Sequence, residues 1–300
     1  MNAYFRPQGI ITALATPLRR DQTVDEDALR RLVEYVLANG VHGVFAVSTQ
    51  GEFYALSTAE KEQVTAVVVD QVRGRVPVYV GTGATTTAEG IALGTRAAAL
   101  GADALSVITP YFVKPSQREL LAHYRAIASA VDLPVVLYNN PPRTGVSLNT
   151  ATVVELAKLD NVVGIKDSSA DLVQTMEYID GCPKDFCVLA GNDALICATL
   201  LMGGAGAIAA SANVAPRLVV DLYEAMCRGD VATAVELQYR LLPLRRAFNL
   251  GTFPVVIKEA MELIGLSAGP AKSPVGGLDE EARDQLRHVL DKLGLLGSAA

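Results

Sequence analysis

Short apolar runs alternate with segments of helical periodicity along most of the chain. Residues 25–39 illustrate the helical pattern, because Leu29, Leu32, Val33 and Val36 fall on one face and Asn39-Gly40 is a typical stop signal. The apolar runs lack the polar–apolar alternation of a half-exposed strand, which is typical of buried parallel strands. Eight runs are predicted to be strands: 9–15, 43–47, 76–80, 104–108, 134–138, 162–165, 186–190 and 206–210.

A helix is expected after each of these strands. Ser116 followed by Glu119, for example, is a capping box that opens a helix running to about residue 130. Eight strand–helix units favour a closed (β/α)8 TIM barrel, an α/β fold, with a doubly wound sheet as the alternative. After about residue 216 only helical periodicity remains. We therefore expect a catalytic barrel in residues 1–228 and a C-terminal helical domain in residues 229–300.

Composition and charge exclude several classes of protein. The net charge is −6 and the basic residues do not cluster, which argues against nucleic-acid binding. No apolar run is long enough to cross a membrane, and the N-terminus lacks the pattern of a signal peptide. The four cysteines show no Cys-x-x-Cys spacing, which suggests reduced, mostly buried thiols. We therefore expect a cytoplasmic protein without membrane or nucleic-acid partners.

The sequence contains no metal or dinucleotide motif. The three histidines are scattered and no His-Glu-x-x-His is present, so a transition-metal site is not expected. Gly81-x-Gly83 carries Thr86 where a dinucleotide fingerprint would need its third glycine. Residues 203–206 are glycine-rich and could hold a phosphate, although tight packing of a helix against a strand explains them equally well.

Polar side chains gather where the predicted strands end, which is the edge that carries the active site of a barrel. Lys166 follows the apolar run 162–165 directly. Lysine is rarely buried, so Lys166 either reaches solvent or lies in a pocket as a nucleophilic amine. Tyr138 and Arg143 follow the preceding strand, and Thr49 follows the second. Each of these residues has an alternative interpretation. Tyr138 could be a core tyrosine, Arg143 a surface or subunit-interface arginine, and Thr49 a turn residue.

This set of residues suits Schiff-base chemistry on a carbonyl compound. The Lys166 amine would add to a 2-oxo acid, and Tyr138 would shuttle protons. Hydroxyl and amide groups at Thr49-Gln50 would bind the carboxylate, and Arg143 would hold a second anionic group. Two other functions remain open. One is a barrel isomerase that binds phosphate at residues 203–206, and the other is a binding module without catalysis.

The chain resembles the dihydrodipicolinate synthase / N-acetylneuraminate lyase family of class I aldolases. The similarity covers nearly the whole chain. Its motifs are Gly-Thr-Gly-Ala at 81–84, Thr-Pro-Tyr at 109–111, Lys-Pro-Ser-Gln at 114–117, Tyr-Asn at 138–139, Arg-Thr-Gly at 143–145 and Gly-Ile-Lys-Asp at 164–167. The resemblance implies a lyase acting on pyruvate or a related 2-oxo acid, usually a homotetramer, with no metal or organic cofactor.

The resemblance also implies roles for individual residues. Lys166 would be the Schiff-base lysine, Tyr138 the proton-transfer tyrosine and Thr49 a relay hydroxyl. The positions expected to contact substrate are Gln50, Arg143, Ser168, Gly191 and the backbone of Ile208.

Several positions depart from the family pattern and bear on the substrate. Gln50 replaces a hydroxyl residue beside the pyruvate carboxylate, and Phe112 replaces a tyrosine that completes a proton relay across a subunit interface. Ala194 replaces an acidic residue of the lyases, which argues against sialic acid. Arg143 favours a synthase-like condensation, whereas Phe112 and Ser168 favour the alternative, a 2-keto-3-deoxy sugar acid aldolase or dehydratase.

A further expectation concerns regulation. Phe53, Tyr54 and Thr58 do not resemble the lysine-feedback site of some synthases, so inhibition by lysine is not expected.

Overall fold

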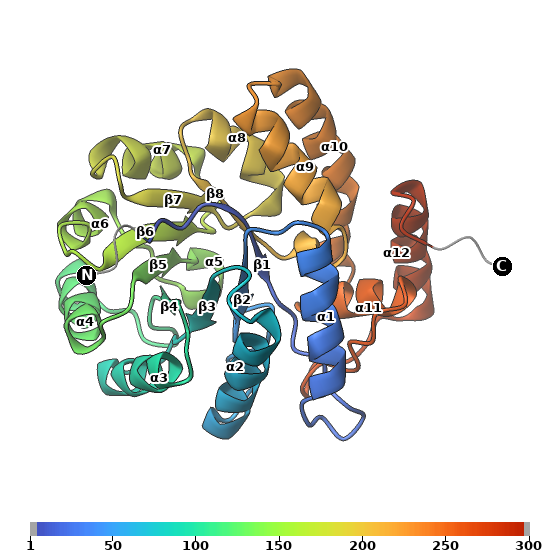
Figure 1. Ribbon diagram of the computed structural model, residues 1–300, viewed down its shortest axis with the longest axis horizontal. Helices are drawn as coiled ribbons and strands as arrows, with labels where there is room; N and C mark the ends of the chain where they lie inside the picture. Colours follow the sequence, from blue (N-terminus) through green and yellow to red (C-terminus); the bar gives the residue numbers. More distant parts are fainter. Residues whose placement is uncertain (1–4, 297–300) are drawn as a thin grey trace.

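A closed barrel of parallel strands forms the centre of the protein (Figure 1). The computed structural model describes residues 5–296. Each strand pairs with the next along the chain, and β8 pairs with β1 to close the barrel. The strands are β1 (Gly9–Ala13), β2 (Gly43–Ala46), β3 (Val78–Gly81), β4 (Ala104–Ile108), β5 (Val135–Asn139), β6 (Val162–Asp167), β7 (Cys187–Ala190) and β8 (Gly206–Ala209). The predicted TIM barrel is confirmed, and the doubly wound alternative is wrong.

The helices that follow the strands form an outer ring around the barrel (Figure 1). Ser116 forms the capping box of α4 with Glu119, as the sequence predicts, and the structure also shows Asp25 capping α1. The helices are α1 (Glu26–Ala38), α2 (Thr58–Val72), α3 (Thr87–Ala99), α4 (Gln117–Ala130), α5 (Pro141–Thr144), α6 (Thr150–Leu156), α7 (Leu172–Gly181), α8 (Ile196–Leu201), α9 (Pro216–Cys227), α10 (Val231–Ala247), α11 (Val255–Leu263) and α12 (Glu280–Lys292). The single-turn α5 lies within a loop for which the sequence pattern predicts no helix.

Apolar side chains fill the inside of the barrel. They come from seven of the strands and form one cluster: Ile11, Ala13, Phe45, Tyr79, Ala104, Val136, Leu189 and Ile208. A second, larger cluster lies between the strands and the surrounding helices. Both faces of the sheet are therefore buried, which is why the strand sequences show continuous rather than alternating apolar residues.

The C-terminal helices pack beside the barrel near α1 and α9 (Figure 1). Helix α9 contacts β1 and α10, and α12 contacts both α10 and α11. The predicted boundary at residue 228 falls between α9 and α10. The division into two domains at that point stays a prediction.

A buried ion pair joins this C-terminal region to the barrel. The Lys258 ammonium of α11 lies 2.6 Å from Glu52 Oε1, and the two side chains are 2% and 1% exposed. Lys258 Nζ also donates to the Pro270 carbonyl at 2.6 Å, and Glu52 Oε2 accepts from the Lys272 amide at 2.7 Å. Burial lowers the pKa of Lys258, and the charge of Glu52 opposes that effect. Glu52 belongs to the loop after β2, so α11 is anchored to the loop that contains Thr49.

The cysteines differ partly from expectation. All four thiols are free, but only Cys187 and Cys197 are buried, Cys182 is half-buried and Cys227 is exposed. The thiols are therefore not mostly buried. Within residues 5–296, no helix is both long and apolar enough to span a bilayer.

Candidate active site

Lys166 lies inside the barrel at the carboxyl end of β6. Strand β6 continues two residues beyond its predicted end, and Lys166 pairs in register with Tyr138 of β5. The side chain is 4% exposed. Its ammonium lies 4.1 Å from the centre of the Tyr138 ring and 5.5 Å from that of Phe45, and the negative faces of aromatic rings attract such a cation. Lys166 is therefore buried beside two aromatic rings and is not a surface lysine.

The Tyr138 hydroxyl lies at the centre of a small polar cluster. Asn140 Nδ2 donates to it at 2.8 Å, and the Thr49 hydroxyl lies 3.4 Å away. Burial raises the pKa of Tyr138, but the Lys166 charge and hydrogen bonds from Thr49, Ser168 and Lys166 outweigh burial, so its pKa is lowered overall. A buried tyrosine with a lowered pKa is suited to accept and return protons.

Asp167 fixes the end of β6 from the outer face of the sheet. Successive residues of a strand point to opposite faces, so Asp167 points outward when Lys166 points inward. Its carboxylate accepts from Asn139 Nδ2 at 3.1 Å and from the Thr175 hydroxyl at 2.7 Å. It also accepts from the amide and hydroxyl of Ser169. These contacts hold the backbone around Lys166 in one position.

The loop after β2 presents Thr49 and Gln50 at the same end of the barrel. Both side chains are buried. Thr16 donates to the Gly51 carbonyl at 2.7 Å, and a Cβ at Gly51 would lie 2.9 Å from the Leu14 carbonyl, so only glycine fits there. Gln50 Nε2 donates to the Pro254 carbonyl at 3.2 Å. Within the part of the chain that the structure describes, the other amide atom, Oε1, is buried and has no hydrogen-bond partner.

Ser168, Gly191 and Ile208 lie around the same end of β6, β7 and β8. The Ser168 hydroxyl donates to the Gly191 carbonyl at 3.1 Å. A Cβ at Gly191 would lie 2.1 Å from Ser168 Oγ, which explains glycine at this position. The Ile208 side chain is buried in the cluster that fills the barrel.

Arg143 and Phe112 lie at the exposed rim of the site. Arg143, in α5, places its guanidinium carbon 4.6 Å from the centre of the Phe253 ring. Its side chain is exposed, and none of the ion pairs formed within residues 5–296 includes it. Phe112 is 96% exposed and has a φ of 74°, a strained conformation for a bulky side chain. Within residues 5–296, Phe112 makes no hydrogen bond or aromatic contact with Tyr138 or Lys166.

The sequence reasoning missed two residues of this region. Asn140 contacts the Tyr138 hydroxyl, and Phe253 stacks on Arg143. Asn140 could have been found, because it lies two residues beyond Tyr138 in the same strand-end segment. Phe253 carries no local signal, since it comes from a distant loop before α11.

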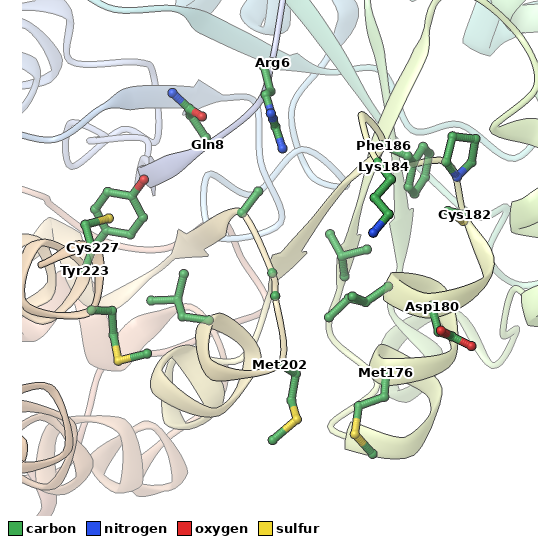
Figure 2. Close-up of a pocket in the computed structure, with 18 residues that line it drawn as sticks. Arg6, Gln8, Met176, Asp180, Cys182, Lys184, Phe186, Met202, Tyr223 and Cys227 are labelled. Atoms are coloured by element: carbon green, nitrogen blue, oxygen red, sulfur yellow. The ribbon is translucent and has the colours of Figure 1, made fainter. Parts of the chain in front are cut away.

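A separate groove of about 780 Å³ lies at the opposite, amino-terminal end of the strands (Figure 2). Arg6 and Lys184 point into it from two sides, and Met202 and Tyr223 lie further along it. Of the glycine-rich residues 203–206, Gly203, Gly204 and Ala205 precede β8 and line part of this groove, and Gly206 begins the strand. A Cβ at Gly204 would lie 2.5 Å from the Thr199 side chain, and one at Gly206 would lie 2.1 Å from the Gly9 carbonyl. Close packing therefore accounts for Gly204 and Gly206, which is the interpretation that the sequence analysis gave as the alternative to phosphate binding.

The site contains no obvious set of metal ligands. Within residues 5–296, no three or more His, Cys, Asp or Glu side chains lie close enough together to hold a metal ion. The chemistry available at the carboxyl end of the barrel comes from a buried amine, a tyrosine and two hydroxyl groups.

Comparison with known proteins gives a consistent picture. The model of the dihydrodipicolinate synthetase family matches residues 6–293. A 4-hydroxy-tetrahydrodipicolinate synthase from Methanopyrus kandleri is 44% identical and the match covers 97% of this chain and 98% of that protein.

Two similar solved structures were determined with pyruvate. YagE of Escherichia coli K12, a prophage protein of the dihydrodipicolinic acid synthase family, superposes with a TM-score of 0.94 at 37% identity, covering 98% of this chain and all of YagE. The chloride-inhibited dihydrodipicolinate synthase of Acinetobacter baumannii gives a TM-score of 0.94 at 37% identity, covering 96% of this chain and 99% of that one.

Proposed function

The chain belongs to the dihydrodipicolinate synthetase family, and on that premise we propose which residues carry out its reaction and which substrates it takes. It is a Schiff-base-forming lyase, a class I aldolase that acts on 2-oxo acids. The observation that carries the residue assignment is the burial of Lys166 against the Tyr138 ring, 4.1 Å from its ammonium. A lysine in such a position is available to a substrate but not to bulk water.

Lys166 is the nucleophile of this mechanism. Its neutral amine attacks the carbonyl carbon of pyruvate and forms a carbinolamine. Loss of water gives an iminium, which withdraws electrons and makes the methyl group acidic. Removal of one methyl proton yields an enamine, whose carbon attacks an aldehyde. Hydrolysis then releases the product and restores the amine.

Tyr138 and Thr49 move protons in these steps. The lowered pKa of Tyr138 suits it to give a proton to the leaving hydroxyl and to take one from the iminium. Thr49 lies within reach of the tyrosine hydroxyl and passes the proton on. The same hydroxyl, with the loop amides and Gln50, binds the pyruvate carboxylate, while Gly191 and the backbone of Ile208 line the pyruvate end.

The acceptor distinguishes two candidate activities. A synthase-like condensation with aspartate semialdehyde, the first candidate, is supported by Arg143, whose exposed guanidinium can bind a second carboxylate. The second candidate is a 2-keto-3-deoxy sugar acid aldolase or dehydratase. It is favoured by the Ser168 hydroxyl beside Tyr138 and by the unpartnered oxygen of Gln50, both of which can bond to substrate hydroxyl groups.

A substrate panel separates these candidates. We expect condensation of pyruvate with aspartate semialdehyde to exceed pyruvate release from 2-keto-3-deoxy acids. Arg143→Ala is expected to raise the KM for the aldehyde by roughly tenfold or more, because a charged hydrogen bond is lost, while the KM for pyruvate stays unchanged.

Added lysine is expected to leave the rate unchanged.

The second candidate would be favoured if activity on the sugar acids were greater and if Arg143→Ala left the KM for the aldehyde unchanged. Pro142→Ala, in the same exposed turn, serves as the control for disturbance of the loop.

We further propose a cytoplasmic homotetramer. Large apolar side chains are exposed on α8 and on two helices that each contact it: Leu201 of α8, Val173 and Met176 of α7, and Val235 and Tyr239 of α10. Exposed apolar surface of this kind is typical of a subunit interface. Sedimentation velocity is expected to show a tetramer, and Leu201→Asp is expected to dissociate it. A monomer at micromolar concentration would contradict the proposal.

A further inference from the structure

We propose that Asn140 is a positioning residue that sets the direction of proton transfer at Tyr138. Its side-chain amide donates to the tyrosine hydroxyl and stabilises the phenolate form that arises during the reaction. The proposal rests on the proposed function, because it assigns a role within the Schiff-base mechanism. It concerns a residue that no motif of the sequence pointed to.

The contact is short and its geometry is fixed. Asn140 is buried, and its Nδ2 lies 2.8 Å from the Tyr138 hydroxyl, closer than Thr49 at 3.4 Å. The Asn140 carbonyl accepts from the amides of Arg143 and Thr144, each at 3.0 Å. It also accepts from the Thr144 hydroxyl at 3.1 Å. Asn140 is therefore anchored as the residue before α5, and its side chain is held against Tyr138.

An amide nitrogen can donate a hydrogen bond but cannot accept one. The Tyr138 oxygen accepts from Asn140, so the tyrosine's own hydrogen must point elsewhere. The Thr49 hydroxyl also donates to this oxygen, at 3.4 Å, and the Lys166 ammonium lies 4.1 Å from the centre of the tyrosine ring. Asn140 thus directs the tyrosine's proton away from α5 and toward the reacting atoms.

The same hydrogen bond favours the ionised tyrosine. The groups facing Tyr138 are the Lys166 ammonium from β6, the hydroxyls of Thr49 and Ser168 and the amide of Asn140. A donor to the oxygen stabilises the phenolate more than the phenol. The Lys166 nitrogen loses its positive charge when it acts as a nucleophile and carries one again in the iminium, whereas the hydrogen bond from Asn140 does not depend on these changes. Its stabilisation of the phenolate therefore persists through every step.

The proton balance shows where this stabilisation matters. Tyr138 gives its proton to the carbinolamine hydroxyl, water leaves, and an iminium and a tyrosine phenolate remain. The phenolate then takes a proton from the methyl carbon of the iminium, which leaves the enamine and restores the phenol. Asn140 supports the phenolate between these two transfers.

Two substitutions of similar size test the proposal. Asn140→Leu removes the hydrogen-bond donor. Asn140→Asp replaces it with a carboxyl group, which when ionised can accept hydrogen bonds but cannot donate them. We expect Asn140→Leu to lower kcat by about tenfold and to change the KM for pyruvate little, with the alkaline limb of the kcat–pH profile about one unit higher, because Tyr138 starts each turnover as the phenol. Asn140→Asp is expected to move the alkaline limb further in the same direction, because its charge opposes the phenolate.

Controls separate this role from a structural one. Pro142→Ala, in the same turn, is expected to leave the pH profile unchanged, and thermal melting checks that each variant is folded. A fall in kcat without movement of the alkaline limb would overturn the proposal. The proposal would also be overturned if Asn140→Asp behaved like the wild type, because the Asn140 side chain would then accept a hydrogen bond from the Tyr138 hydroxyl instead of donating one.

Borohydride trapping of a pyruvyl adduct on Lys166 distinguishes this failure from a failure of the proposed function. Trapping in the wild type and the variants, with an unmoved alkaline limb, would overturn only the role of Asn140. Absence of trapping in the wild type would overturn the Schiff-base assignment itself.

Discussion

Replacing Lys166 by alanine is expected to abolish turnover, with a loss of about 10⁴-fold or more in kcat. The reason is that the amine forms the covalent bond through which every later step passes, and no neighbouring group can replace it. The rings of Tyr138 and Phe45 lie 4.1 and 5.5 Å from its ammonium, and neither side chain is an amine. The measurement is a pyruvate-dependent rate at saturating substrate.

The loss should not arise from unfolding. Lys166 is 4% exposed, so its removal leaves a small cavity but also removes a buried charge. Lys166→Met, which keeps the volume of the side chain, is the matched control and is expected to be equally inactive and at least as stable. Retention of more than a few per cent of the activity in either variant would contradict the mechanism.

Replacing Lys258 by methionine is expected to destabilise the protein by about 3–5 kcal/mol. The substitution leaves the Glu52 carboxylate buried, with the Lys272 amide as its one remaining hydrogen-bond donor among the contacts of residues 5–296. An uncompensated buried charge is costly because protein interiors solvate ions poorly. Denaturant unfolding measures the loss. Activity should fall as well, since Glu52 belongs to the loop that holds Thr49.

A second substitution tests the cause of this destabilisation. Lys258→Met combined with Glu52→Gln removes both charges and is expected to be more stable than Lys258→Met alone. Lys158→Met is the control at an exposed ion pair with Glu155, where a change below about 1 kcal/mol is expected. Purely additive effects of the two buried substitutions would show that the ion pair is not the source of the stability.

The sequence was sufficient to predict the barrel and the general location of the site. Eight buried strands, each followed by a helix, are compatible with few topologies, and the carboxyl ends of parallel strands meet at one edge. Lys166 and Tyr138 were therefore expected to lie near each other, and the pairing of β5 with β6 brings them into register. The capping box of Ser116 with Glu119 was also read correctly.

Contacts between distant segments could not be predicted. Gln50 donates to the Pro254 carbonyl, and Lys258 pairs with Glu52, across more than half of the chain. No periodic pattern or motif encodes such pairs, because they depend on where the C-terminal helices pack on the barrel. The stacking of Arg143 on Phe253 has the same origin.

Covalent trapping of pyruvate tests the central assignment most directly. The full-length protein is incubated with pyruvate, reduced with borohydride, digested and mapped by mass spectrometry. A pyruvyl adduct on the peptide that contains Lys166, absent without pyruvate and absent in Lys166→Met, is the expected result. Modification of a different lysine, or no adduct in an enzyme that turns over pyruvate, would contradict the account.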